Sequence, residues 1–158
     1  MKNAFYATLL ISLSVACGVV KEPAPLSIGT VTLFNYKINN EVPIIGNVDF
    51  KFIGNANNFN KIFHMTKASG GAATIPDFTT QSVVAIILQP TEKVVSVNIQ
   101  KAEIWGEQLR IHYTITDTAS FTTYKQIPVV VATVPKSIKV KEVSFFSEHM
   151  KEKTIPAF

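Results

Sequence analysis

The sequence holds only one cysteine and one tryptophan, and charged residues make up only 16% of its 158 positions. A single cysteine excludes disulfide bonds within the chain, so a packed core has to stabilise the folded domain. All but one of the 15 cationic residues are lysines. Because arginine is the usual ligand for phosphates and base edges, the net charge of +4 is no indication of nucleic-acid binding. The 47% of hydrophobic residues exclude a largely disordered chain, and the length leaves no room for a second sizeable domain.

The N-terminal segment is typical of an exported protein. Lys2 is followed by an uncharged stretch from Ala4 to Ala16, which is too short to cross a bilayer as a helix but suits the hydrophobic region of a signal peptide. Small residues precede Cys17, and the pattern resembles the lipobox of bacterial lipoproteins, in which the cysteine is lipidated and becomes the new N-terminus. Ser14 stands where a lipobox usually has leucine. A plain signal peptide with an incidental cysteine is the alternative.

A lone thiol in an exported protein needs an explanation, and lipidation of Cys17 supplies one. We expect a lipoprotein signal peptide at 1–16 and an extended, proline-containing tether at 17–29. The membrane is then one partner of the protein, reached through the lipidated cysteine. The expected location is the bacterial cell envelope, at the outer membrane, and the sequence leaves open which face of that membrane carries the domain.

Most of the chain beyond the tether has the periodicity of β-strands. Residues 30–38 and 138–146 are rich in β-branched and aromatic residues, and 48–53 alternates between apolar and polar side chains. The runs 83–88 and 129–134 are apolar throughout, which predicts central strands that are covered on both faces.

The clearest element is a hairpin that turns at Gly106. In its first arm, from Val95, alternate residues share a face until the phase slips at Gln100 and Lys101, which predicts a β-bulge. Its second arm, 109–116, alternates without interruption.

One segment breaks the β pattern. Within 57–66 the apolar residues recur at intervals of three and four, which predicts a short helix over about 58–66. We therefore expect a mainly β fold: an antiparallel β-sandwich or partly open barrel of about six to seven strands with this one inserted helix. An α+β fold is the alternative. The single domain should occupy 30–147, followed by a charged tail at 148–158.

The order of features from the helix onward is Asp77-Phe78, the apolar strand 83–88, the hairpin and a strand bracketed by Pro128 and Pro135. This order resembles the C-terminal domain of PrcB-like proteins over about residues 58–137. These are bacterial lipoproteins or secreted proteins, named after a subunit that accompanies and stabilises a surface protease. The resemblance implies a domain without catalytic residues that has a protein partner. Lys93-Val94 stands where the family usually has a Gly-Gly pair.

Side chains that could carry chemistry do not form a known motif. His64, His112 and His149 have no HxH or HExxH spacing, so neither a metal nor another cofactor is expected. Asp77 and Asp117 could form an acid–base pair, but aspartates at strand ends usually bind the amides of turns.

The Ser69-Gly70-Gly71 run fits neither a nucleophile elbow nor a phosphate loop, and favours a flexible turn. No enzymatic activity is expected. Trp105 and Gly106, at the hairpin tip, are the best candidates for a partner contact, because aromatic side chains are enriched in binding sites. The lysines of 136–141 favour a solvated strand face, with anionic lipid or an acidic partner as the alternative.

The expected function is therefore a non-enzymatic envelope lipoprotein domain that mediates a protein–protein interaction, with stabilisation of a surface protease or another envelope assembly as its role. A protease-inhibitor-like module is one alternative. A small-ligand or carbohydrate-binding accessory protein is the other.

Overall fold

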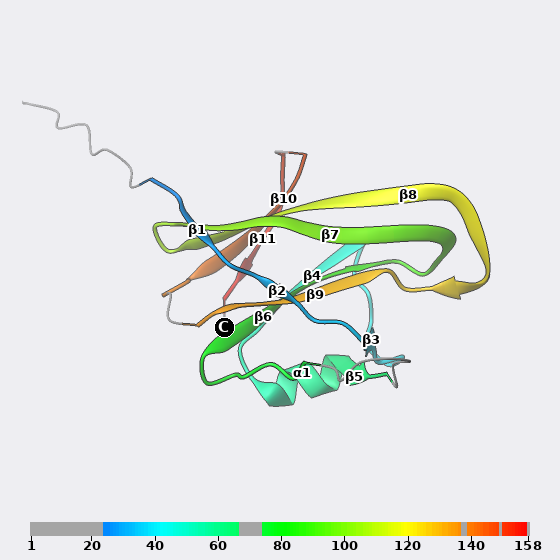
Figure 1. Cartoon of the computed structure of the whole chain (residues 1–158), viewed down its shortest axis with the longest axis horizontal. Helices are drawn as coiled ribbons and strands as arrows, with labels where there is room; N and C mark the ends of the chain where they lie inside the picture. Colours follow the sequence, from blue (N-terminus) through cyan, green and yellow to red (C-terminus); the bar gives the residue numbers. More distant parts are fainter. Residues whose placement is uncertain (1–23, 67–73, 137–138, 149, 158) are drawn as a thin grey trace, which may run out of the picture.

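The computed structural model describes residues 24–66, 74–136, 139–148 and 150–157. Over these ranges the chain forms eleven strands and one short helix in three layers (Figure 1). The predicted mainly β fold with one inserted helix is confirmed. Two large sheets pack face to face as a β-sandwich, and the helix covers the outer face of the second sheet. The strands outnumber the six to seven expected, mainly because four of them have only two or three residues.

The first sheet holds five strands in the order β1, β7, β8, β10, β11. These are β1 (Leu26–Ile28), β7 (Thr91–Trp105), β8 (Gln108–Gln126), β10 (Glu142–Ser147) and β11 (Met150–Pro156). The sheet is mixed rather than purely antiparallel, because β10 runs parallel to β8. After β9 in the second sheet, the chain re-enters the first sheet beside the start of β8, where Lys141 N donates to Glu107 O at 2.8 Å.

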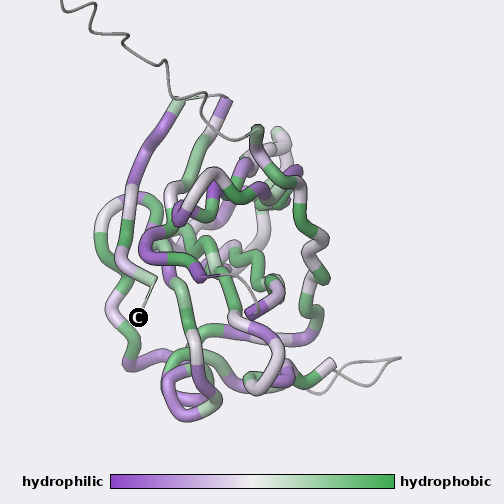
Figure 2. The backbone as a smooth tube through the Cα atoms, turned by 90° about the vertical axis from the view of Figure 1, so that its left-hand side faces the viewer, coloured by the Kyte–Doolittle hydropathy of each residue, from purple (hydrophilic) through white to green (hydrophobic). Residues whose placement is uncertain are grey.

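The second sheet is antiparallel in the order β2, β9, β6, β4. Its strands are β2 (Val31–Thr32), β9 (Val129–Pro135), β6 (Gln81–Leu88) and β4 (Val48–Ile53). The prediction that the two apolar runs are central, covered strands is confirmed. Val84 and Ile86 of β6 face the first sheet, whereas Val83 and Ile87 face the helical layer, and all four are 0% exposed. Figure 2 shows hydrophobic strand segments running through the middle of the molecule.

The third layer consists of α1 (Ala56–Ile62) and the two-stranded sheet of β3 (Tyr36–Ile38) and β5 (Phe63–Met65). The helix is shorter than the predicted 58–66. Asn55 caps its N-terminus by accepting a hydrogen bond from the Asn58 amide at 2.8 Å. It ends at Ile62 because Phe63 takes an extended conformation and pairs with Ile38.

The predicted hairpin and its bulge are confirmed. Trp105 pairs with Gln108 at the turn, and the register shifts between Ile99 and Lys101, which leaves Gln100 as the extra residue. Leu109, Ile111 and Tyr113 face the core, as the alternation predicts; each is at most 1% exposed.

Four expectations at the ends of the domain need correction. The segment 30–38 is not one strand: Asn35 has φ 66°, a left-handed conformation that asparagine tolerates, and it divides β2 from β3. The expected tether contributes β1, which pairs with β7. The expected charged tail forms β11, and the strand expected at 138–146 begins only at Glu142. Ile155 packs against the core while the lysines of β11 stay in solvent, and charged side chains are common on edge strands.

Candidate functional site

Trp105 and Gly106, the predicted contact residues, lie at the turn of the long hairpin. Gly106 has φ 60°, which glycine adopts without strain. The guanidinium carbon of Arg110 lies 3.9 Å from the centre of the Trp105 ring, and the tryptophan is half-buried. The tryptophan therefore offers only part of its surface to a partner, and its role in binding stays a prediction.

A cluster of charged and aromatic side chains covers the outer face of the first sheet beside this turn. The ring of His112 stacks on the ring of Phe146 with their centres 5.0 Å apart, and Arg110 lies 5.8 Å from the same phenylalanine. Glu103 is buried within the cluster, where its carboxylate contacts His112 Nε2 at 3.0 Å and also pairs with Lys101 Nζ. His112 is thus held by structural partners on two sides.

The charge of Glu103 is fixed by these contacts. The hydrogen bond from Lys101 holds the pKa of this carboxyl group below its usual value, and the bond with His112 acts in the same direction, while burial opposes both. The carboxylate is therefore ionised at neutral pH and serves as a fixed negative charge between the side chains of Lys101 and His112.

The opposite end of the hairpin carries a different feature, residues 117–126 of β8, which we call the arch (Figure 1). β8 has more residues than β7 here, since Val95 pairs with Asp117 but Thr91 pairs with Gln126. Three hydrogen bonds from arch side chains to the backbone of β7 hold the arch in place. They run from Thr118 Oγ1 to Val94 O at 3.3 Å, from Thr122 Oγ1 to Glu92 O at 3.1 Å and from Gln126 Nε2 to Lys93 O at 3.2 Å.

The arch presents two aromatic side chains to solvent. Phe121 is 68% exposed and Tyr124 is 67% exposed. Large aromatic residues on a surface are typical anchors of protein interfaces. Sequence reasoning missed this pair, although two aromatic residues three positions apart in an otherwise polar run were a usable signal.

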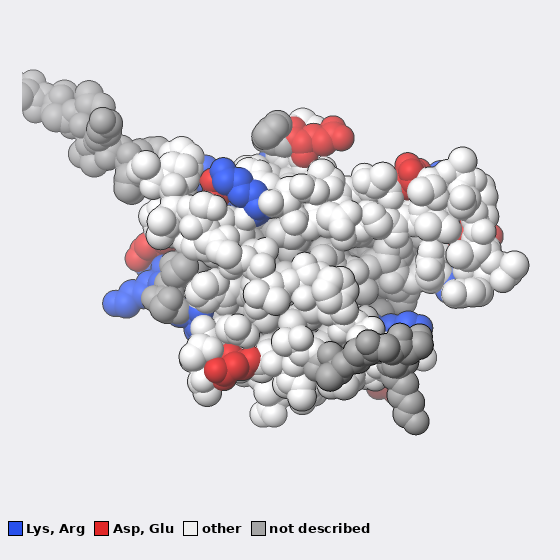
Figure 3. All heavy atoms as spheres, viewed as in Figure 1, with Lys and Arg blue, Asp and Glu red and all other residues white. Residues whose placement is uncertain are grey.

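A groove of about 760 Å³ opens beside the arch. One wall is formed by Val95–Val97 of β7 and another by Ile127–Val129, and β3 forms the floor. Lys37, His64 and Lys125 line it, and no acidic residue is among the described residues that do. Lys or Arg side chains lie on both sides of the hollow at the right-hand end of Figure 3. No sequence motif predicted this groove, because its walls come from four separate segments.

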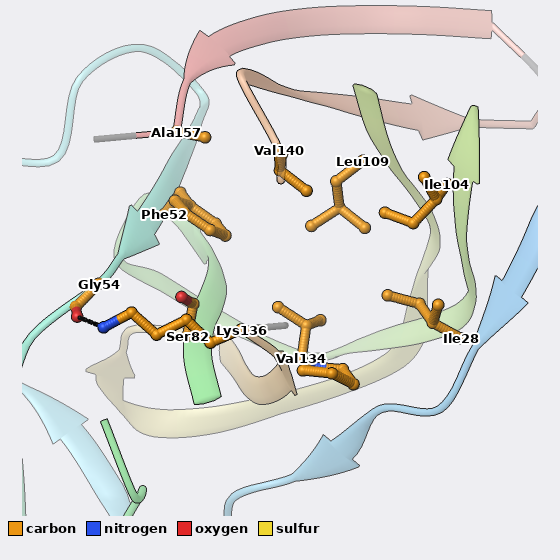
Figure 4. A pocket seen from close by; sticks show the side chains of 11 residues that line it. Ile28, Phe52, Gly54, Ser82, Ile104, Leu109, Val134, Lys136, Val140 and Ala157 are labelled. Atoms are coloured by element: carbon orange, nitrogen blue, oxygen red, sulfur yellow. Dashed lines mark hydrogen bonds between the residues drawn. The ribbon is translucent and has the colours of Figure 1, made fainter. Parts of the chain in front are cut away.

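A second cavity, of about 130 Å³, lies near the hairpin tip between the two large sheets (Figure 4). Its lining is mainly apolar and includes Phe52, Leu109 and Val134. Lys136 lies at its rim and donates from Nζ to the carbonyl oxygens of Gly54 and Phe78, at 2.9 Å each. Ligand sites usually measure several hundred Å³, so this cavity is too small for a peptide or a sugar.

The other candidate residues lie apart. Asp77 binds Thr79 and Thr80 in the turn before β6, and the Thr79 hydrogen bonds lower the pKa of the Asp77 carboxyl group. Asp117 lies in the arch, 3.5 Å from Lys93 Nζ. The two aspartates therefore do not form an acid–base pair.

His64 is separated from His112, since the first lies in β5 and the second on the outer face of the first sheet. His64 Nδ1 contacts Asn39 Oδ1 at 2.7 Å. The described ranges hold no group of three His, Cys, Asp or Glu side chains that could bind a metal ion. Cys17, the Ser69-Gly70-Gly71 run and His149 lie outside the described residues.

Comparison with known proteins adds no relative. No family model, no curated protein and no solved structure matches this chain. Among the residues that the structure describes, no helix is long and apolar enough to cross a membrane.

Proposed function

We propose that this protein is an envelope lipoprotein, anchored by Cys17, whose domain binds a protein partner and catalyses no reaction. The observation that carries the proposal is the position of Phe121 and Tyr124, which are exposed at the end of the domain opposite to β1 (Figure 1). This proposal moves the main partner contact from the hairpin tip to the arch.

The point at which the chain enters the domain supports a partner contact at the arch. Leu26 pairs with Ile104, so the chain enters the domain beside the hairpin tip. Cys17 precedes Ala24 by seven positions, and seven extended residues span at most about 25 Å. A lipid on Cys17 would hold the tip close to the bilayer. The arch begins nine residues along β8 from Gln108, which corresponds to about 30 Å of strand and would place it on the far side of the domain.

The contacts of the polar side chains support a role in binding rather than catalysis. His112 is held by Glu103 and Phe146, and Asp77 is bound within its own turn. The resemblance to PrcB-like proteins supports a protein partner from the envelope, such as a surface protease or another surface assembly.

The test is affinity capture of the full-length, lipidated protein from its own envelope, followed by mass spectrometry. We expect a specific protein to be retained by the wild type and lost from a Phe121→Ser/Tyr124→Ser variant. The expected loss is at least tenfold, since interface aromatic residues commonly contribute about 2 kcal/mol or more to binding.

The matched control is a Leu26→Ser/Met150→Ser variant, because these two apolar side chains are also exposed, at 62% and 70%, but lie outside the arch. Equal retention by the wild type and the arch variant would contradict an arch contact. Hydrolysis of a peptide, ester or glycoside substrate that depends on His112 or Asp77 would contradict the non-enzymatic part of the proposal.

A further inference from the structure

We propose that the groove beside the arch binds an extended, acidic peptide segment of the partner as an added strand on the free edge of β7. This inference rests on the proposed function, because it names the kind of segment by which the partner is held. It is carried by three observations: an open strand edge, a groove of sufficient size, and cationic lining.

The edge of β7 is open because β1 is short. β1 pairs with β7 only from Ala102 to Ile104, and after Ile28 the chain crosses to the second sheet as β2. Beyond that point no described strand lies on this side of β7. A strand edge with free N–H and C=O groups is a template for another strand, and extended peptides bind such edges through main-chain hydrogen bonds.

The open edge contains one regular stretch. The pairing of β7 with β8 shifts register before Val95 and again after Ile99, whereas Val95–Ile99 pairs without interruption. This stretch suits a short added strand, which would occupy the position in the sheet that β1 leaves after Ile28. Val95 and Val97 also line the groove, so the open edge and the groove coincide.

The other wall contributes main-chain groups of its own. Pro128 O accepts from Leu88 N on the β6 side of β9, and Val131 O accepts from Leu33 N on the β2 side. Because the main-chain groups of successive strand residues point to opposite sides, those of Val129 point to the same side as those of Val131. The pairing of β2 with β9 does not extend as far as Val129. Val129 N–H and C=O are therefore positioned at the groove.

The lining selects for negative charge. Lys37 on β3 and Lys125 on the arch both line the groove, and within the described ranges neither forms an ion pair with a carboxylate. Ile38, Ile127 and Val129 add apolar side chains to the same lining. A strand presents alternate side chains to opposite sides, so a segment with apolar residues on one side and carboxylates near its ends is complementary to this groove.

The test uses a displayed library of random short linear peptides, selected against the full-length protein in detergent. We expect the selected peptides to be enriched in Asp or Glu together with β-branched residues. Their affinity should fall about tenfold at low salt in a Lys37→Glu/Lys125→Glu variant, because opposite charges in a groove attract and like charges repel. A Lys151→Glu/Lys153→Glu variant has the same change of net charge on β11, at the other edge of the sheet, and should bind as the wild type does.

Strand addition has its own signature. Selected peptides should slow hydrogen exchange of backbone amides within Val95–Ile99, and N-methylation of alternate peptide amides should abolish binding. The inference is overturned if no peptide is enriched, if the selected peptides lack acidic residues, if the groove variant binds them as tightly as the β11 variant, or if exchange in β7 is unchanged.

The two proposals can fail separately. If the Lys37→Glu/Lys125→Glu variant still captures the envelope partner while the arch variant does not, partner binding at the arch stands and the groove inference is overturned. If neither the wild type nor any variant captures a protein, the proposed function fails even though the peptide experiment still reports on the groove.

Discussion

The hydroxyl group of Tyr113 in β8 donates to Glu152 Oε2 in β11 at 2.6 Å, across the intervening strand β10. Tyr113 is only 1% exposed and packs in the main core. Its burial raises the pKa of the tyrosine, and the bond to Glu152 raises it further, so the hydroxyl keeps its proton and remains a donor. This bond fastens the C-terminal strand to the core.

Tyr113→Phe should therefore lower the free energy of unfolding by about 1–2 kcal/mol, because a hydrogen bond to a charged acceptor is lost. Denaturant unfolding gives this value, and hydrogen exchange should show faster opening of β11. Glu152→Ala should show much the same loss. If the effects of the two substitutions simply add in the double variant, the side chains do not interact in solution.

The central strand β6 should be far more sensitive to truncation than the outer face of the hairpin. Ile86→Ala should cost about 2–5 kcal/mol, because Ile86 is 0% exposed and the change leaves a cavity. Thr114→Ala, which removes one surface hydrogen bond with Gln100, should cost about 0.5 kcal/mol. Thermal and denaturant unfolding measure both values. Equal losses of stability in the two variants would contradict the placement of Ile86 in the core and of Thr114 on the outer face of β8.

Glu103 predicts a specific dependence of stability on pH. The pKa of the Glu103 carboxyl group is lower in the folded protein than the usual 4.5. The contribution of this group to the free energy of unfolding is therefore complete above the usual pKa, and it is lost as the pH falls through the lowered pKa of the folded state. Glu103→Gln should lower the free energy of unfolding at pH 7. It should also make this free energy depend less steeply on pH in the acid range. Lys101→Met removes the largest cause of the lowered pKa, so the loss of stability on acidification should begin at a higher pH. An acid limb identical in wild type and both variants would contradict this assignment.

Lipidation at Cys17 predicts stable membrane association. Cys17→Ser should abolish lipid labelling and move the protein out of the membrane fraction, because the lipid on this cysteine is the proposed membrane anchor. Fractionation with a salt wash and with detergent measures the change. Retention of the serine variant in salt-washed membranes would argue against a lipid anchor.

The central part of the fold could be predicted because its signal is local. The apolar run Val83–Leu88 is buried on both faces as its composition indicates, and the bulge at Gln100 follows from a phase slip in the sequence. The end strands could not be predicted in this way. β11 has a charged sequence whose strand form depends on pairing with β10, and β3 exists only because Asn35 redirects the chain and Phe63 supplies a partner.

The candidate site was less predictable. Trp105 could be recognised in the sequence as the single tryptophan beside a glycine. The stacking of Arg110 on its ring could not be predicted from the sequence. Phe121 and Tyr124 could have been noted from the sequence, yet their exposure depends on the extra residues of the arch. The groove brings β3 beside β7 and β9, and such juxtaposition of distant segments has no local pattern.

The most direct test of partner binding at the arch is photo-crosslinking in intact cells, with a photoreactive phenylalanine in place of Phe121 or, as the control, Met150. Both positions are exposed, and only the first lies in the arch. We expect a discrete protein adduct from position 121 and none from position 150, with both variants still in the membrane fraction. Adducts only with lipid, or the same protein adducts from both positions, would contradict a protein partner held by the arch.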